Sequence, residues 1–150
     1  MFSARAQPAG CGEELFDAAA DGDLEAVLLL LDLGAPTEWA DEYGSRALHG
    51  TSNRAIAEAL LLRGAEVDAR MDDQSTPLIN AAYSGRSDVL PALLVGGADA
   101  AAQDEDDMTA LDHAREECNR GCVAVLEAWA GGERDAAALA VVMGAAAHPS

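Results

Sequence analysis

The sequence predicts an all-α solenoid, in which helix-turn-helix units of about 33 residues stack side by side. Gly-Ala pairs recur 30 and 33 residues apart, at Gly34-Ala35, Gly64-Ala65 and Gly97-Ala98. Leucines that open the first helix of each unit recur at steps of 33, 30 and 33 residues, at Leu15, Leu48, Leu78 and Leu111. Such a period is typical of units that bury their apolar sides against their neighbours rather than in one central core.

The third unit carries the fullest version of the pattern. We expect Thr76 to cap its first helix and Pro77 to occupy the first helical position, where its missing N–H removes no hydrogen bond. Gly85 should allow the turn between the two antiparallel helices, and Ser87 should cap the second. Because Pro91 falls near the start of that second helix, we expect it to begin irregularly.

With its Thr-Pro-Leu start at residue 76 and its period near 33, the chain resembles the ankyrin-repeat family over residues 13–130. The resemblance implies helix pairs with short β-turn fingers in four repeats, at about residues 13–40, 41–70, 71–103 and 104–130. The first repeat lacks a preceding β-turn and is interpreted as the N-terminal capping unit. We expect residues 1–12 to form a flexible leader and residues 131–150 to form an alanine-rich capping helix and tail.

Two units depart from the family pattern. In unit two, Arg46-Ala47-Leu48-His49 stands where Thr-Pro-Leu-His is usual, and the unit is three residues short. We therefore expect a first helix of about one turn, which makes unit two the weak point of the stack. In unit four, Cys118 replaces the turn glycine, and Gly131-Gly132 is expected to break the repeat.

The charge of the chain is strongly one-sided. It has 27 acidic residues against nine basic residues, all arginine, and a net charge of −18. Free nucleic acid is therefore not expected as a partner, because the chain repels phosphate and offers no basic stripe. Acidic residues fall at each predicted fingertip, at Asp41-Glu42, Asp72-Asp73 and Asp104–Asp107. They are interpreted either as a solubilising surface or as an acidic edge that attracts a basic patch on a partner.

Composition also bears on location and assembly. No apolar run approaches the roughly 20 residues that a membrane-spanning helix needs, so no membrane partner is expected. Residues 1–12 contain no apolar signal-peptide core, which favours a cytoplasmic protein, with the nucleus as the alternative. We expect a monomer.

Catalytic and metal-binding patterns are missing from the sequence. It has no Gly-x-Ser-x-Gly elbow, phosphate-binding glycine loop or His-Glu-x-x-His pair, so we expect no enzyme and no cofactor. His113, Cys118 and Cys122 do not supply the four converging ligands of a zinc site, and Cys122 is interpreted as a small buried hydrophobe. His49 stands where the ankyrin resemblance implies a structural histidine that hydrogen-bonds between adjacent turns.

The resemblance also implies binding of a partner protein through a concave face, made by the fingertips and the exposed side of each first helix. The matching positions are Trp39, Glu42, Tyr43 and Ser45 in unit two, Asp72, Asp73, Ser75, Tyr83 and Ser84 in unit three, and Glu105, Asp106, Met108, Glu116 and Glu117 in unit four. Tyr43 and Tyr83 are the favoured anchors, since aromatic hot spots cost about 2 kcal/mol or more on truncation. For Trp39, binding and packing under its own finger are equally open, and Trp129 is expected to pack against the C-terminal tail.

A narrower resemblance links the chain to the small ankyrin inhibitors of cyclin-dependent kinases. Four repeats, about 150 residues and a curtailed first helix in unit two are features of that group, and residues 43–46 and 57–66 are similar to its second repeat. The chain departs from the group at Asn80, where the inhibitors tend to carry an aspartate. Kinase inhibition and a passive anchoring or scaffold role therefore stand as alternative functions.

Overall fold

The computed structural model describes the backbone of residues 11–147 and the side chains of residues 11–142. Over this range the chain is helical and contains no strand. Its helices are α1 (Cys11–Asp21), α2 (Leu24–Asp32), α3 (Ala47–Gly50), α4 (Arg54–Leu62), α5 (Pro77–Ser84), the 3-10 helix η1 (Ser87–Val89), α6 (Leu90–Val95), α7 (Ala110–Glu116), α8 (Arg120–Ala130) and α9 (Ala136–Ala147).

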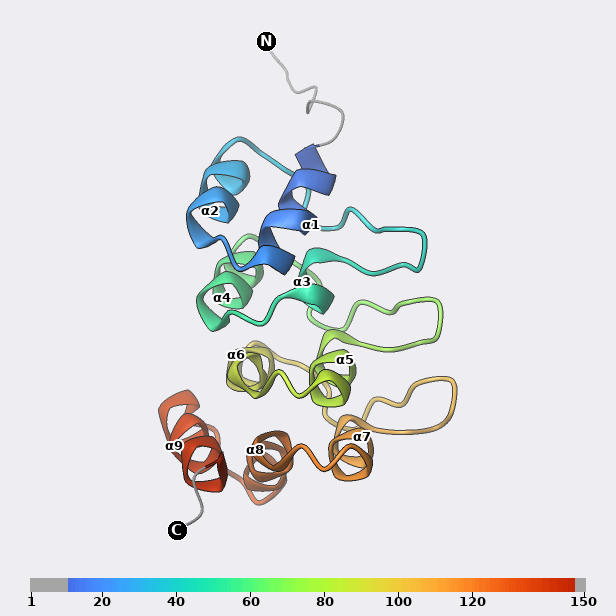
Figure 1. The fold of residues 1–150 in the computed structure, drawn as a ribbon, viewed down its shortest axis with the longest axis vertical. Helices are drawn as coiled ribbons and strands as arrows, with labels where there is room; N and C mark the ends of the chain where they lie inside the picture. The colour runs from blue at the N-terminus through green and yellow to red at the C-terminus, as the bar shows by residue number, and fades with distance from the viewer. Residues whose placement is uncertain (1–10, 148–150) are drawn as a thin grey trace.

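The helices form four antiparallel pairs that stack along the long axis of the molecule (Figure 1). The first helices of the pairs, α1, α3, α5 and α7, lie beside three long loops on the right of the view, and the second helices lie further left. We call these loops the fingers: finger two (residues 36–46), finger three (66–76) and finger four (99–109). The all-helical stack confirms the predicted fold class.

The local signals of unit three act as predicted, with one exception. The Thr76 side chain accepts a hydrogen bond of 3.2 Å from the Ile79 N–H, and Pro77 occupies the first turn of α5. Gly85 ends α5 in the left-handed conformation, at φ 75°. The second helix begins with the 3-10 turn η1, in agreement with the expected irregular start. The prediction that Ser87 caps this helix is wrong, because Ser87 is the first residue inside η1 rather than the residue before it.

The first helix of unit two is reduced to one turn, as predicted. Its residue His49 is 1% exposed and its Nδ1 accepts a hydrogen bond from the Arg46 N–H, so Nε2 carries the proton and donates to the Ala69 carbonyl at 2.9 Å. Burial lowers the pKa of His49, which keeps the imidazole neutral. His49 is thus the structural histidine that the sequence indicated.

Unit three supports the end of this one-turn helix. The Asn80 side-chain amide donates to the His49 carbonyl at 3.0 Å, and the Arg86 guanidinium approaches the Thr51 carbonyl at 3.5 Å. One unit further along, Asn119 stands at the position of Arg86 and donates to the Ala82 carbonyl at 2.7 Å. Carbonyl groups that a helix end leaves without an internal partner are therefore satisfied by the next unit in the stack.

Units three and four both end with a glycine in the left-handed backbone conformation. Gly97 and Gly132 follow their helices at φ 105° and 109°. Both glycines close the helix in a conformation that other residues rarely adopt. Cys118 takes the turn position of Gly85 at φ 58°, which confirms the predicted replacement.

The first helix starts earlier than expected. Cys11 and Gly12, which the sequence analysis assigned to the leader, belong to α1 and are buried. Gly12 lies against Trp39, since a Cβ added there would stand 2.6 Å from the Trp39 Cβ. This contact anchors the first turn of α1 and explains why the helix extends to Cys11. Residues 1–10 lie outside the described residues.

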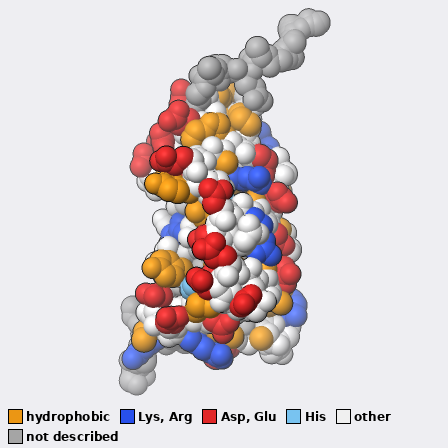
Figure 2. Space-filling model, turned by 90° about the vertical axis from the view of Figure 1, so that its right-hand side faces the viewer, with side chains coloured by type: hydrophobic (Ala, Val, Ile, Leu, Met, Phe, Trp, Pro, Cys, Tyr) orange, Lys and Arg blue, Asp and Glu red, His pale blue; other side chains and the backbone are white. Residues whose placement is uncertain are grey.

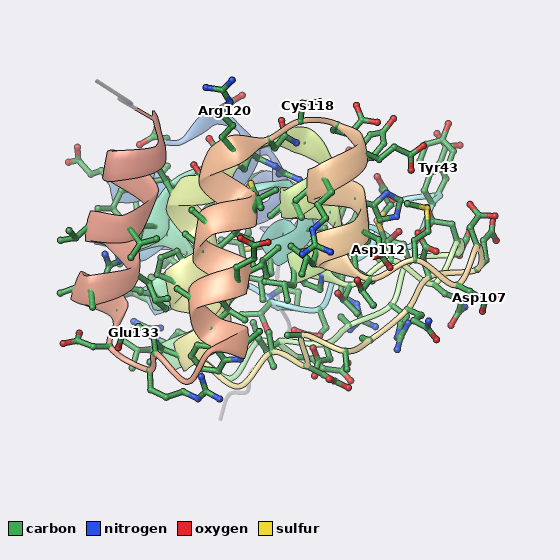
Figure 3. All side chains as sticks on the ribbon, turned by 90° about the horizontal axis from the view of Figure 1, so that it is seen from below. Tyr43, Asp107, Asp112, Cys118, Arg120 and Glu133 are labelled. Atoms are coloured by element: carbon green, nitrogen blue, oxygen red, sulfur yellow. The ribbon has the colours of Figure 1, made fainter. Side chains whose placement is uncertain are left out.

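The hydrophobic core extends along the stack between the helix pairs. Leu15, Leu48 and Leu78 are 3% exposed or less, whereas Leu111 in the last pair is only half-buried. Viewed from below, α7, α8 and α9 lie side by side as the last layer (Figure 3). On this layer Arg115 and Glu127 form an ion pair of 2.9 Å that joins α7 to α8. The last pair of helices thus carries polar contacts of its own at the end of the stack.

The C-terminal helix lies beside the stack rather than across its end. α9 packs against α8 and also reaches α6 (Figure 1), and it inserts the fully buried Leu139. Trp129, at the end of α8, is half-buried, and the Arg134 guanidinium lies 4.1 Å from the centre of its ring. Trp129 therefore contacts the C-terminal segment, as expected.

Candidate functional site

The three fingers are joined to one another by backbone hydrogen bonds. The Asp72 N–H donates to the Tyr43 carbonyl at 3.0 Å, and the Glu105 N–H donates to the Asp73 carbonyl at the same distance. These bonds link finger two to finger three and finger three to finger four. The fingertips therefore form one continuous edge instead of three independent loops.

Each finger is also closed within itself. In finger two, the Asp41 carboxylate accepts hydrogen bonds of 2.9 Å from the N–H groups of Tyr43 and Ser45. In finger four, the Asp104 carboxylate accepts from Asp106 at 2.9 Å and from Met108 at 3.1 Å. An aspartate that binds the backbone two residues ahead is a common way to fix a tight turn.

Acidic side chains cover the finger side of the molecule over most of its length (Figure 2). Arg46 neutralises part of the base of this surface, because one of its Nη atoms lies 2.7 Å from Glu38 and 2.9 Å from Glu66. Six acidic residues lie at the fingertips: Glu42, Asp72, Asp73, Glu105, Asp106 and Asp107. Among the described side chains, none of the six forms an ion pair. The tips therefore keep their negative charge.

Two tyrosines stand out from this face. Tyr43 is 62% exposed on finger two, and Tyr83 is 54% exposed near the end of α5. Figure 3 places Tyr43 on the finger side of the molecule, as it does Asp107. Exposed aromatic rings at these two positions agree with the sequence-based prediction that neither belongs to the core.

Tyr83 rests on a histidine of the next unit. Its ring lies edge-on to the His113 imidazole, with centroids 5.6 Å apart and an interplanar angle of 86°. The His113 Nε2 in turn lies 2.6 Å from the Asp104 carboxylate, and both of these side chains are largely buried. Sequence reasoning noted Asp104 and His113 separately, but it did not find the contact, which connects α7 to its own finger.

The Asp104 carboxylate is held in its ionised form. Its partial burial opposes ionisation, but hydrogen bonds from His113 and from the Met108 and Asp106 N–H groups outweigh this effect and lower the pKa of Asp104. An ionised Asp104 accepts one hydrogen bond from the imidazole Nε2–H and two from the backbone N–H groups at once. Finger four and Tyr83 are thus positioned through the same side-chain pair.

Several predicted contact residues are less accessible than expected. Ser45 and Ser75 are 8% and 6% exposed, so the expectation that they present side chains to a partner is wrong. Both stand at the base of a finger, where their carbonyls accept hydrogen bonds from the Asp41 and Met71 N–H groups and close the loop. Met108, at the same position in finger four, is half-buried. Ser84, Glu116 and Glu117 are exposed near the turns that follow α5 and α7.

Trp39 packs inside its own unit. Its ring meets Phe16 of α1 edge-on, with centroids 5.4 Å apart, and its Cβ lies against Gly12. The side chain is half-buried. Packing under its own finger, one of the two interpretations of the sequence, therefore accounts for its position.

Other chemistry-bearing residues are dispersed. Cys118 is exposed at a turn and Cys122 is 1% exposed on α8, where burial raises the pKa of its thiol to about 11 despite the nearby Arg86. No three His, Cys, Asp or Glu side chains gather around a possible metal position in the part of the chain that the structure describes. Within residues 11–147, none of the helices combines the length and apolar character that crossing a bilayer requires.

Comparison with known families agrees with the stacked helix pairs and fingers. The family model for ankyrin repeats, in three copies, matches residues 50–130, which is more than half of the chain. The matched segment runs from the end of α3 to the end of α8 and includes fingers three and four. On this match and on the stack of helix pairs, the chain belongs to the ankyrin-repeat family.

Proposed function

We propose that this chain is a non-catalytic module that binds a partner protein through its fingers and the exposed side of its first helices. Ankyrin repeats are in general protein-protein interaction modules. The observation that carries the proposal for this face is the exposure of Tyr43 and Tyr83 in a chain whose aromatic content is only 4%. Large aromatic side chains contribute most to the energy of protein interfaces, so their exposure on a linked row of fingers favours binding there.

The proposed contact surface combines these two tyrosines with the polar residues around them. It comprises Tyr43, Tyr83, Glu42, Asp72, Asp73, Ser84, Glu105, Asp106, Met108, Glu116 and Glu117. Because the carboxylates at the fingertips lack cationic partners, we propose that the partner presents a basic patch to them. Complementary charge of this kind accelerates association and selects the partner, and it contributes less to the affinity itself.

The experiment is capture of partners from a cell lysate with the wild-type chain and with Tyr43→Ala/Tyr83→Ala. Each truncation should cost about 2 kcal/mol if the ring is a hot spot, which is roughly a 30-fold loss of affinity. Leu29→Ala is the matched control, because Leu29 is 61% exposed on α2, away from the fingers. A protein retained by wild type and control but lost from the folded double variant supports the proposal. Equal recovery by all three variants contradicts it.

Inhibition of a protein kinase of the cyclin-dependent type is the second candidate function. The one-turn helix α3 favours it, since a curtailed first helix in unit two is one of the features on which that resemblance rests. Asn80 weighs against it, because its amide is engaged with the His49 carbonyl and an aspartate could not donate this bond. A kinase assay separates inhibition from a passive scaffold role: an inhibitor lowers the activity of the captured kinase, whereas a scaffold leaves it unchanged.

A further inference from the structure

The C-terminal helix has an apolar composition on every side, but its described side chains are covered on one side only. α9, Ala136–Ala147, consists of alanine, valine, leucine, methionine and glycine. Helices that are apolar all round are normally buried all round. Here Leu139 is fully buried against the stack, while Val141 is 71% exposed. The outward side of α9 therefore lacks the cover that its composition favours.

A groove lies directly beside this helix. It has a volume of about 490 Å³, and it is lined by Leu61, Leu62, Ala92, Val95, Gly96 and Ala136 among others. We call it the outer groove. Leu62 and Val95 at its edges are 86% and 52% exposed, and Glu58 is the one charged residue among the described residues that line it. Gly96 lets α4 and α6 approach, since a Cβ there would stand 2.8 Å from the Leu61 side chain.

The outer groove repeats the position that α9 itself occupies. α9 packs against α8 and α6, two successive outer helices of the stack, and the groove lies over α6 and α4, the same pair one unit earlier (Figure 1). Because the units repeat, the two positions have similar shapes. An apolar helix with small side chains, such as α9, therefore fits the groove.

We propose that the outer groove and the exposed side of α9 form a twofold interface between two copies of this chain. Groove and helix are neighbours on one face, since Ala136 of α9 lines the groove. A twofold axis at this face places each α9 over the groove of the other copy, so that Val141 meets Leu62. Such a self-complementary patch is what an isologous dimer requires.

The distribution of charge favours a second copy over a different protein. Two chains of net charge −18 repel each other, and the acidic fingers lie on the side opposite to α9 (Figure 1). Contact through the outer groove keeps the two finger edges apart, and its one carboxylate, Glu58, already pairs with Arg54 at 3.4 Å. A basic partner, by contrast, is attracted to the fingers. The proposed dimer differs from the monomer that the sequence led us to expect.

The interface is expected to be weak. Two short helix-in-groove contacts lie at the small end of specific interfaces, below about 1,200 Å² in total, so dimerisation should depend on concentration in the micromolar range. The bilayer is a less suitable partner for α9, because 12 residues extend only about 18 Å and the hydrocarbon core is about 30 Å thick.

The test is analytical ultracentrifugation of the full chain from about 5 to about 500 μM. Leu62→Glu and Val141→Glu each place a carboxylate in the proposed contact, and both positions are exposed enough for the fold to tolerate them. Leu29→Glu carries the same charge change on α2, outside the groove, and is the control. Wild type and control should dimerise, and each groove variant should raise the dissociation constant at least about tenfold.

Three results would overturn this inference. The first is a wild-type chain that stays monomeric throughout the concentration range. The second is a dimer that forms equally well with Leu62→Glu and Val141→Glu. The third is a monomer that binds vesicles of neutral phosphatidylcholine and loses this binding with Val141→Glu, which would assign α9 to a lipid surface. None of these results bears on the finger face, because the proposal concerns the opposite side of the molecule.

Discussion

The side-chain amide of Asn80 lies 3.0 Å from the backbone carbonyl of His49 and donates a hydrogen bond to it. The two residues are 31 positions apart and belong to adjacent units, so the bond crosses the junction between the one-turn helix α3 and the full helix α5. A side chain of the following unit therefore stabilises α3, the shortest α-helix among the described residues.

Replacing Asn80 by aspartate should destabilise the chain by about 1–3 kcal/mol, because a carboxylate would face the His49 carbonyl without a proton to donate. Urea unfolding at neutral pH measures this change. Gln103→Glu is the control, since the Gln103 amide makes its bond on the exposed surface of finger four, and its loss should cost less than about 0.5 kcal/mol. Equal costs for the two variants would contradict the role assigned to Asn80.

Unit two should open before unit three under native conditions. Its first helix has four residues and its second has nine, whereas α5 alone has eight and is followed by a continuous second helical segment. Local opening follows such differences in hydrogen bonding and burial. We therefore expect amides of α3 and α4 to exchange with deuterium faster than those of α5 and α6. Slowest exchange in unit two would show that the contacts from Asn80 and Arg86 more than compensate for the short helix.

The free energy of unfolding should decrease at acid pH because of Asp104. The pKa of Asp104 is lower in the folded chain than in the unfolded chain, so its contribution to stability is present above the unfolded value of about 4 and is lost as the pH falls through the lower, folded value. Asp104→Asn should therefore lower the unfolding free energy at pH 6, and the difference from wild type should shrink toward pH 3. Asp107→Asn removes the same charge from the same finger without touching His113 and is the control. A pH-independent difference for Asp104→Asn would contradict the assignment.

Three of the described non-glycine residues hold a backbone conformation that suits glycine. Gln74 and Asp107 have φ of 69° and 60° at the finger position where Gly44 has 79°, and Cys118 has 58° where Gly85 has 75°. Left-handed backbone costs a side-chain-bearing residue about 1–2 kcal/mol, which the greater freedom of glycine in the unfolded chain offsets in part. Gln74→Gly and Cys118→Gly should each stabilise the chain by up to about 1 kcal/mol. Ser84→Gly, inside α5, should do the opposite, and thermal unfolding of the three variants tests both signs.

The cysteines should differ in reactivity. Cys118 is exposed, while Cys122 is 1% exposed and burial raises the pKa of its thiol to about 11. Because the thiolate is the reactive form, Cys122 should remain unmodified by iodoacetamide at pH 8 in the folded chain, and Cys118 should be alkylated. Peptide mass spectrometry reads both sites, and labelling in urea is the control in which both react. Rapid modification of Cys122 without urea would show that α8 opens readily.

The parts of this fold that could be predicted from the sequence are those that local residue chemistry determines. The cap at Thr76, the turn at Gly85 and the shortening of α3 depend on a few adjacent residues, and each was predicted correctly. The cap at Ser87 was not, because the 3-10 turn moves the start of the helix by one position. A period of about 33 residues supplied the overall arrangement, since stacking is the way such units bury their apolar sides.

Features that depend on tertiary contacts were harder to predict from the sequence. Ser45 and Ser75 are buried at the bases of their fingers, although serine is a polar residue whose presence in the sequence does not indicate burial. The contact between Asp104 and His113 joins a loop to a helix nine positions away, a spacing that no helical or strand period selects. The position of α9 was hidden for another reason: a helix that is apolar on every side gives no indication of which side faces the core.

The hydrogen bonds from Asp72 to Tyr43 and from Glu105 to Asp73 also affect the thermodynamics of any contact at the fingertips. Separate loops lose conformational entropy when a partner orders them, and that loss weakens the complex. In this chain the loss at the backbone of these tips has already occurred during folding, as part of the cooperative stack. A partner that binds there would therefore lose less free energy in ordering the backbone of these tips.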